Sequence, residues 1–472
     1  MSATVERMSR VDNAWLRMDN DVNLMMIVGV WLLQPAVAYD ALCRRVEERL
    51  LKYPRFRQKV VPDALGAVWV DDADFDIHHH VVREPLQRRR GQSERAALQA
   101  RCGELATTPL DPGRPLWQFH LVEHYGGGSA LLVRIHHCIG DGISLTSVVL
   151  SITDGGESPP QRAHSSPDGG EHDWLSSTLI RPLTDLAVKA IDLSGEGVAR
   201  SMEAVAHPQD STRELARLGV RVATDMAALA LMENDSPTRL KGKPGGRKVV
   251  AWGEPVPLDV VKSVGKALGA SVNDVLLACV AGAIGDYLRS LGDDPADKGI
   301  RAMVPVNLRP LDEAYKLGNR FGLAPLVLPI GIDNPVARVL AVRERMGGLK
   351  GSYQPVLAFG VLALAGLLNK RTQDALLGLF AKKATAVMTN VPGPAQALRF
   401  CGAELRQSIF WVPQTGEVAV GVSIFSYAGG VQFALITDTE ICADPQRIID
   451  RFAPELDKLL WLTLMLPWGD GT

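Results

Sequence analysis

The sequence predicts an α/β protein built from two lobes that a helical linker joins. The chain has 472 residues, which is more than one ordinary domain contains. Both halves mix helical and strand-like apolar patterns, and residues 154–173 between them are rich in glycine, serine and proline, as exposed linkers are. We therefore expect an N-terminal lobe at residues 1–153, a linker with a helical segment at 154–245, and a C-terminal lobe at 246–472.

The spacing of apolar residues predicts the elements of each lobe. In the N-terminal lobe it predicts helices at 39–51, 94–105 and 143–152, and strands at 68–70, 75–82, 117–124 and 130–137. The linker is predicted to be helical over 175–232. In the C-terminal lobe it predicts helices at 258–268 and 271–291, and strands at 249–252, 300–306, 323–328, 418–425 and 431–436. Ser271 is placed to cap the second of these helices, because a serine hydroxyl can accept a hydrogen bond from the first turn.

Composition and charge exclude several classes of protein. A formal net charge of −2 provides no general attraction for nucleic acid. The six cysteines lack CxxC spacing, which argues against a zinc site or a disulfide framework and indicates a reducing compartment. The polar start has no secretory signal, and the longest apolar run, residues 355–368, is shorter than the ~20 residues of a spanning helix. We expect a cytoplasmic protein that does not cross a membrane.

Three apolar segments leave two alternatives open. Residues 24–33, 355–368 and 459–466 could pack in the core or contact lipid. Residues 367–383 combine apolar side chains with Lys370, Arg371, Lys382 and Lys383. This pattern is typical of a surface helix that lies on a membrane, so these residues are the candidate for peripheral contact with the inner face of the plasma membrane or a lipid droplet.

The candidate chemistry lies at the end of the strand predicted at residues 130–137, where residues 136–142 read HHCIGDG. Side chains alternate along a strand, so His136 and His137 should face opposite sides and only one can address a given cleft. A neutral imidazole, whose ordinary pKa is about 6.5, can accept the proton of an attacking hydroxyl near neutral pH. Asp141 could anchor the following turn through an arginine or a backbone N–H, and the glycines beside it would permit tight backbone angles.

Other interpretations of these residues remain open. A histidine pair at a strand end is often structural, and Cys138 raises the alternative of a thiol nucleophile. Residues 78–80 are also histidines, but three successive side chains on a strand alternate between faces and cannot converge on one metal ion. The chain has no GxSxG, Walker A or HExxH motif.

Further sequence blocks accompany HHCIGDG in a fixed order. PLW stands at 115–117, NDVLLA at 273–278, MVPVNLRP at 303–310, GNRFG at 318–322 and TNVPGP at 389–394. With residues 9–16, these blocks resemble those of the bacterial wax ester synthase/acyl-CoA:diacylglycerol acyltransferase family, whose signature is HHxxxDG and whose NDVVLA block differs here at Leu276. The signature alone is shared with nonribosomal-peptide condensation domains and other relatives of chloramphenicol acetyltransferase, so the specificity comes from the whole set.

The resemblance implies a fold and a role for each motif residue. It implies two chloramphenicol-acetyltransferase-like lobes with a central tunnel. By motif position, His137 would be the general base, His136 and Asp141 would support the motif, and Gly142 would let the chain pass closely. The candidates for substrate binding are Trp117, Asn273 and Asp274. For Trp117 core packing is the alternative, and for Asn273 it is an ordinary polar position at a helix start.

The resemblance also implies the reaction. A fatty acyl group would pass from acyl-CoA to diacylglycerol, giving triacylglycerol, or to a long-chain alcohol, giving a wax ester. The hydroxyl would attack the thioester directly, with a backbone N–H or Asn273 as the donor to the oxyanion. No metal or cofactor is expected, since acyl-CoA is a substrate. Two alternatives stay open: a condensation-type enzyme that uses carrier-bound acyl groups, although no carrier domain is visible, and a lipid-binding protein without catalysis, against which the intact HHCIGDG argues.

Overall fold

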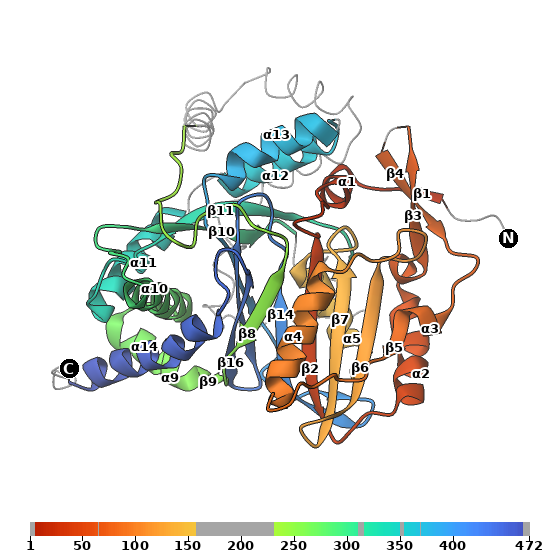
Figure 1. The fold of residues 1–472 in the computed structure, drawn as a ribbon, viewed down its shortest axis with the longest axis horizontal. Helices are drawn as coiled ribbons and strands as arrows, with labels where there is room; N and C mark the ends of the chain where they lie inside the picture. Colours follow the sequence, from red (N-terminus) through yellow and green to blue (C-terminus); the bar gives the residue numbers. More distant parts are fainter. Residues whose placement is uncertain are drawn as a thin grey trace, which may run out of the picture.

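The computed structural model describes residues 5–64, 66–156, 231–309, 316–349, 354–368 and 370–465. Residues 157–230, which hold most of the expected linker and its helix, lie outside these ranges, and residues 231 and 232 are not helical. The described residues form two α/β halves that lie side by side, each with its own large β-sheet (Figure 1). The predicted fold class is confirmed.

The N-terminal half is organised around a six-stranded sheet of order β13-β14-β2-β7-β6-β5. Strand β7 (Gly128–His136) lies between β2 (Met26–Gln34) and β6 (Trp117–Tyr125), antiparallel to both. The apolar residues of β7 are buried, and the strand ends at the first histidine of the HHCIGDG segment. Helix α5 (Gly142–Ile152) follows and is capped by Asp141, whose side chain accepts a hydrogen bond from the Ser144 N–H.

Smaller elements surround this sheet, and those at residues 39–49, 66–71 and 94–107 lie where the sequence predicts a helix, a strand and a helix. The smaller elements are β1 (Val5–Arg7), α1 (Arg10–Arg17), α2 (Tyr39–Arg49), β3 (Gln58–Asp63), β4 (Gly66–Asp71), α3 (Ile77–His80), β5 (Val81–Arg83) and α4 (Glu94–Thr107). The strand predicted at residues 75–82 is wrong. Asp76 accepts a hydrogen bond from the His78 N–H and caps the single helical turn α3, and only the last residues extend as β5.

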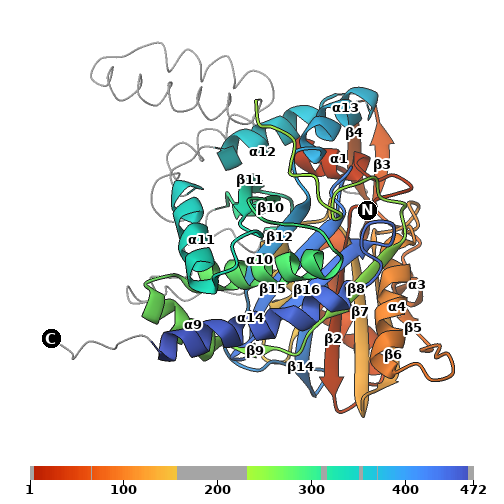
Figure 2. The same cartoon turned by 60° about the vertical axis from the view of Figure 1, so that its left-hand side comes forward.

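The C-terminal half contains a seven-stranded sheet of order β11-β10-β12-β15-β16-β8, with β9 beside β16. Its strands are β8 (Lys248–Trp252), β9 (Val256–Pro257), β10 (Ile300–Asn307), β11 (Phe321–Leu328), β12 (Ala386–Pro392), β15 (Val420–Tyr427) and β16 (Gly430–Asp438). The helices are α9 (Leu258–Leu268), α10 (Val272–Ser290), α11 (Pro335–Leu349), α12 (Gln354–Ala365), α13 (Lys370–Ala381) and α14 (Gln446–Leu464). Helices α9, α10, α11 and α14 pack against one another (Figure 2).

The C-terminal half contributes strands to the N-terminal sheet, so the two sheets do not follow the expected division at residues 153 and 246. Strands β13 (Arg399–Phe400) and β14 (Ala403–Trp411) come from the C-terminal half, yet β14 pairs antiparallel with β2 and extends the N-terminal sheet. One core cluster also contains residues of both halves, among them Val30, Leu98, Trp252 and Trp411. This shared core holds the two sheets against each other.

Two helices, α10 and α1, position residues of the site. Helix α10 begins with the predicted cap: the Ser271 hydroxyl accepts from the Asp274 N–H, and the Asp274 carboxylate accepts from the Ser271 N–H. Helix α1 packs against α12 (Figure 1). Among the described residues no single helix has the length and apolar composition to span a membrane, although α9 and α10 pass that test as a pair bent by 100°.

Candidate active site

His137 is fixed through its backbone at the point where β7 ends. Its N–H donates to the Met25 carbonyl, with an N–O distance of 2.7 Å. Its carbonyl oxygen accepts from Asn319 Nδ2, also at 2.7 Å. Met25 lies just before β2 and Asn319 just before β11, so each half of the molecule contributes one of these hydrogen bonds. A residue held on both sides presents its side chain in a defined direction.

The imidazole of His137 lines a cavity of about 290 Å³ to which both halves contribute. This volume is close to the lower end of the range of small-molecule sites. The N-terminal half supplies Trp15, His137, Asp141, Gly142, Ile143 and Thr146, and the C-terminal half supplies residues of α10, β10, β11, β12 and β14 and their neighbours. Most of the C-terminal lining is apolar, with Asn273, Asn307, Thr389 and Asn390 among its polar members. The histidine motif therefore lies at a cavity between the two halves.

The surroundings of His137 keep its ring neutral. Only 5% of the residue is exposed, and burial lowers the pKa of His137 to about 4, although the nearby Asp141 carboxylate acts to raise it. Within the described part of the chain, Nδ1 is buried without a hydrogen-bond partner. Nε2 is therefore the ring nitrogen that a molecule in the cavity can reach, and the lowered pKa favours the neutral form of the ring at pH 7.

His136 faces away from this cavity, as the alternation of side chains predicts. Its Nδ1 accepts a hydrogen bond from the Cys138 N–H at 3.1 Å, and its Nε2 lies 3.2 Å from Asp19 Oδ2. The Cys138 N–H needs a lone pair on Nδ1, so Nε2 carries a proton that faces the carboxylate; burial opposes the charged ring, but Cys138 and Asp19 raise the pKa of His136 to about 10. The ring lines a second cavity of about 400 Å³, whose other polar lining residue is Asp19. These contacts fit the supporting role expected for His136.

Asp141 anchors the motif and does not bind the imidazole. Its Oδ1 accepts from the Ser144 N–H at 2.9 Å, while Oδ2 accepts from Arg309 Nη2 at 3.2 Å and from the Arg320 N–H at 3.0 Å. Both side chains of the Asp141–Arg309 ion pair are almost fully buried. The expectation that Asp141 binds an arginine and backbone N–H groups is confirmed, and the arginine comes from the other half of the molecule.

The reason expected for Gly142 is wrong. A Cβ atom at this position would meet no atom within 4 Å, so no other segment passes closely. Gly142 is the first residue of α5 and lines the cavity. The missing side chain therefore leaves room inside the cavity, next to His137.

The structure places the three candidate substrate-binding residues in different surroundings. Asn273 lines the cavity, and its Oδ1 accepts a hydrogen bond from Asn390 Nδ2. Asp274 does not line it, because its carboxylate belongs to the capping box of α10. Trp117 is fully buried outside the cavity, where Nε1 donates to the Phe56 carbonyl at 2.9 Å and the indole stacks on His80. Binding roles for Asp274 and Trp117 are thus wrong, and the packing alternative for Trp117 is confirmed.

Four residues at the site were not assigned a role from the sequence. Trp15 stacks on the His137 ring with centroids 4.1 Å apart and an interplanar angle of 12°, and Phe321 lies 5.6 Å from the same ring. Asn319 binds the His137 carbonyl, and Arg309 binds Asp141. All four belong to blocks that carried the family resemblance, at residues 9–16, 303–310 and 318–322. That membership was the available signal, but only the folded chain shows what each residue touches.

The three histidines of α3 have separate partners. His78 Nδ1 lies 2.9 Å from the Tyr39 hydroxyl, His79 Nδ1 lies 3.3 Å from Asp76, and His80 Nδ1 lies 2.8 Å from the Trp117 carbonyl. Among the residues that the structure describes, no group of three or more His, Cys, Asp or Glu side chains is arranged to hold a metal ion.

Comparison with known proteins agrees with this geometry. The family model described as the wax ester synthase/diacylglycerol acyltransferase catalytic domain matches residues 8–276, more than half of the chain, and the model of the C-terminal domain of the same family matches residues 317–460. A probable diacylglycerol O-acyltransferase of Mycobacterium tuberculosis (strain H37Rv) is 26% identical over 453 residues, which cover 93% of this chain and 92% of the relative. A putative diacylglycerol O-acyltransferase of Mycobacterium bovis is 28% identical, covering 95% and 97%.

Solved structures show the same fold. The wax ester synthase/diacylglycerol acyltransferase from Marinobacter aquaeolei VT8 is similar with a TM-score of 0.64 and 21% identity, over 98% of this chain and 100% of that one. The first condensation domain of the CDA synthetase is similar with a TM-score of 0.60 and 16% identity, over 98% and 97%. At these identities the structures support the fold alone, while the family models span both halves of the sequence. The chain therefore belongs to the wax ester synthase/diacylglycerol acyltransferase family and is an acyltransferase.

Proposed function

We propose that this enzyme transfers a fatty acyl group from acyl-CoA to the hydroxyl group of diacylglycerol or of a long-chain alcohol, with His137 as the general base. The names of the relatives support these two classes of acceptor. The observation that carries the proposal is the position of His137, a neutral imidazole on the wall of a largely apolar cavity between the two halves. Apolar walls suit an acyl chain, and the imidazole suits removal of a hydroxyl proton.

The reaction proceeds by direct attack. The acceptor oxygen forms a bond with the thioester carbonyl carbon while its proton moves to Nε2 of His137, and the carbonyl π electrons move onto oxygen. The tetrahedral intermediate then collapses, the C–S bond breaks, and the CoA sulfur takes the proton from the imidazolium. The enzyme returns to its neutral form with one ester and one CoA formed. A thioester is already activated, so this sequence needs no metal and no cofactor.

Donors to the oxyanion stand beside His137. The first residues of α5, Gly142 and Ile143, line the cavity, and the N–H groups of a first helical turn have no partner within the helix. Asn273 presents its amide from the opposite wall, with its oxygen turned to Asn390. Removal of an oxyanion donor lowers kcat by about 10²- to 10³-fold. An Asn273→Ala variant that keeps the wild-type kcat would assign this role to the backbone of α5.

The proposal is tested with purified protein and labelled palmitoyl-CoA. The acceptors are dipalmitoylglycerol and hexadecanol in separate reactions, and both CoA release and the ester product are measured. We expect one ester per CoA with at least one acceptor. A parallel reaction supplies palmitoyl groups on an acyl carrier protein. Turnover only with the carrier-bound donor would replace our proposal with a condensation-type reaction. If no donor gave a product, the alternative of a lipid-binding protein without catalysis would replace it.

The pH dependence of kcat/KM is expected to show an acid limb well below the ordinary range of histidine. Because burial lowers the pKa of His137 to about 4, the base is protonated only as the pH falls toward that value. Activity should therefore be constant from about pH 8 to below pH 6.5 and decline near pH 4, since kcat/KM follows the free enzyme. Circular dichroism at each pH separates protonation from unfolding. A limb centred at or above pH 6.5 would contradict the buried, neutral base.

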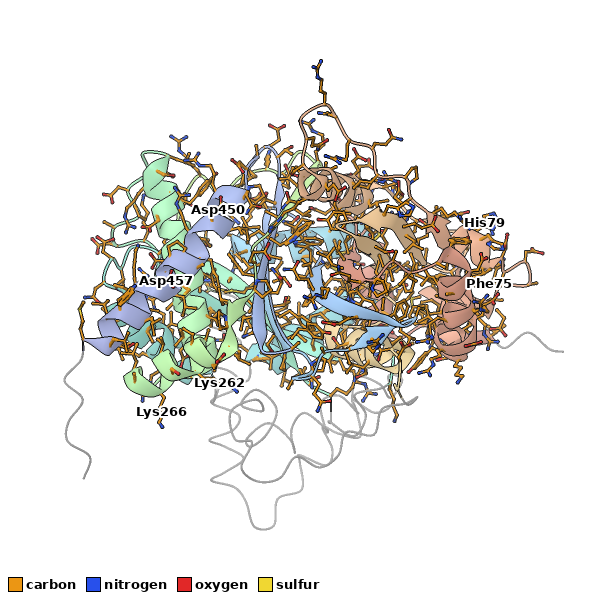
Figure 3. All side chains as sticks on the ribbon, turned by 90° about the horizontal axis from the view of Figure 1, so that it is seen from below. Phe75, His79, Lys262, Lys266, Asp450 and Asp457 are labelled. Atoms are coloured by element: carbon orange, nitrogen blue, oxygen red, sulfur yellow. The ribbon has the colours of Figure 1, made fainter. Side chains whose placement is uncertain are left out.

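Peripheral membrane contact is proposed at the end of α14. Trp461 is 62% exposed and Met465 77% exposed, and α9, which packs beside α14, carries the exposed Lys262 and Lys266 (Figure 3). Exposed aromatic and apolar side chains favour a membrane surface, and the lysines of the neighbouring helix favour anionic lipid, whereas the exposed Asp457 of α14 opposes it. The candidate at residues 367–383 is weaker, because Lys370 Nζ donates to the Arg17 carbonyl and to Asp374.

Sedimentation with phosphatidylcholine/phosphatidylglycerol vesicles tests this surface. The double variant Trp461→Glu/Met465→Glu should bind at least about tenfold more weakly than wild type, since two apolar side chains are lost from the interface. The control is Val61→Glu, which changes an exposed apolar residue of the N-terminal half. Equal binding by the double variant and the control would refute this position of the contact.

A further inference from the structure

A neutral base in a buried cavity must become a cation during the reaction. Burial favours the neutral ring of His137 and opposes the imidazolium that forms when the ring accepts a proton. The charged and titratable neighbours act in opposite directions: Asp141 favours the cation, and His136 opposes it. The Asn319 side chain binds the His137 backbone carbonyl, and hydrogen bonding to Asn319 and to the His137 backbone acts with Asp141 to raise the pKa of the ring, but burial outweighs these contributions. Stabilisation of the imidazolium therefore also depends on what covers the faces of the ring.

Trp15 covers one face of that ring. The indole and imidazole centroids are 4.1 Å apart and the rings are nearly parallel, at 12°. Phe321 approaches both rings at a tilt, 5.6 Å from His137 and 5.7 Å from Trp15. Trp15 is itself 7% exposed and lines the cavity. The face of an indole carries negative charge density and attracts a cation within about 6 Å of its centroid, most strongly where water is excluded.

Helix α1 holds the indole in this position. The Asp12 carboxylate accepts two hydrogen bonds from Asn319, from its backbone N–H at 2.9 Å and its Nδ2 at 2.7 Å. The same Nδ2 donates to the His137 carbonyl, so Asp12 on α1 and the base share one amide. On its other side α1 is bound to the α12–α13 region, where Gln373 Nε2 donates to the Ala14 carbonyl at 2.9 Å. Trp15 is thereby fixed relative to His137 from both directions.

We propose that Trp15 is a positioning residue that holds the His137 ring in its reactive orientation and stabilises the imidazolium as the acceptor hydroxyl loses its proton. This inference rests on the proposed role of His137. Proton transfer, formation of the C–O bond and departure of CoA take place as in the reaction proposed for His137. Trp15 neither gains nor loses an atom in these steps. Its contribution is larger for the cationic than for the neutral ring, so it acts on the reaction step rather than on binding of the substrates.

Fluorination of Trp15 tests the cation–π contribution without a change of shape. Tryptophans with zero, one, two and four ring fluorines are introduced at residue 15 of the full chain by nonsense suppression. Each fluorine withdraws charge from the indole face, so kcat should fall stepwise, by about tenfold over the series, while KM stays within about twofold. The matched control is the same series at Trp117, which stacks on His80 outside the cavity; there kcat should not change.

Two further variants complete the test. Trp15→Leu keeps an apolar side chain but has no π face, and should lose more kcat than Trp15→Phe, which keeps a smaller π face. A flat response of kcat to fluorination, or equal kcat in the Leu and Phe variants, would overturn the inference and leave Trp15 a packing residue. The His137→Ala variant is measured in parallel. If that variant kept full activity, the proposed base itself would be wrong, and this outcome is distinct from a flat fluorine series in an enzyme that depends on His137.

Discussion

Replacing His137 with alanine is expected to lower kcat by roughly 10²- to 10⁴-fold, the range that general acid–base catalysis contributes. The only other histidine of the motif cannot take over, because His136 faces a different cavity and binds Asp19 and the Cys138 N–H. The substitution removes a ring that packs against both Trp15 and Phe321, so the melting temperature and circular dichroism must show that the variant is folded. KM should change far less than kcat.

His136→Ala serves as the comparison for that experiment. It removes an imidazole of equal size from the adjacent position, with its contacts on the opposite side of β7. We expect this variant to lose stability and to keep far more of the wild-type kcat than His137→Ala. The reverse order of kcat would assign the base to His136, and full activity of His137→Ala would remove the imidazole from the reaction altogether.

The second large effect is expected on stability. Asp141→Ala should lower the free energy of unfolding by about 3–5 kcal/mol, because it breaks the buried ion pair between this carboxylate and the Arg309 guanidinium. It also removes the cap of α5, which accounts for about 1 kcal/mol of such a loss. Arg309 keeps its hydrogen bond to the Gly318 carbonyl at 2.5 Å, which limits the loss. The midpoint and slope of urea unfolding measure this change in the free energy of unfolding.

Two variants separate the contributions of Asp141. Asp141→Asn keeps an oxygen that can accept from the Ser144 N–H but removes the charge, so its difference from Asp141→Ala reports the cap. The double variant Asp141→Ala/Arg309→Met removes both charges and should be less destabilised than the sum of the single variants. Strict additivity would show that the two side chains do not stabilise each other across the interface of the two halves.

The local parts of the fold could be predicted from the sequence. The buried strand that ends at the two histidines, the turn and α5 follow from an apolar run, two glycines and a capping Asp141. The start of α10 follows from Ser271. The strand predicted at residues 75–82 failed because local apolar spacing does not reveal that Asp76 caps a helical turn. The pairing of β14 with β2 was not predicted, because the contact between residues 403–411 and the N-terminal sheet leaves no pattern in either segment alone.

In the site, too, local sequence predicts some features, whereas contacts with distant segments could not be predicted. The opposite directions of His136 and His137 follow from strand geometry and are confirmed. The partners of His137 come from segments more than 100 residues away, as in the stacking of Trp15 and the hydrogen bond from Asn319. The neutral state of the base also depends on burial that only the assembled halves create. Sequence blocks identified the residues, whereas their contacts required the fold.

The central claim, direct attack on acyl-CoA assisted by His137, is tested most directly by intact-mass spectrometry of the enzyme with palmitoyl-CoA and no acceptor. The account predicts no acylated protein and no burst of free CoA, followed by CoA and ester in equal amounts once dipalmitoylglycerol or hexadecanol is added. Cys138 next to the base is fully buried, and Cys138→Ala should behave like wild type. A palmitoylated enzyme that passes its acyl group to the acceptor, and disappears in Cys138→Ala, would contradict direct transfer.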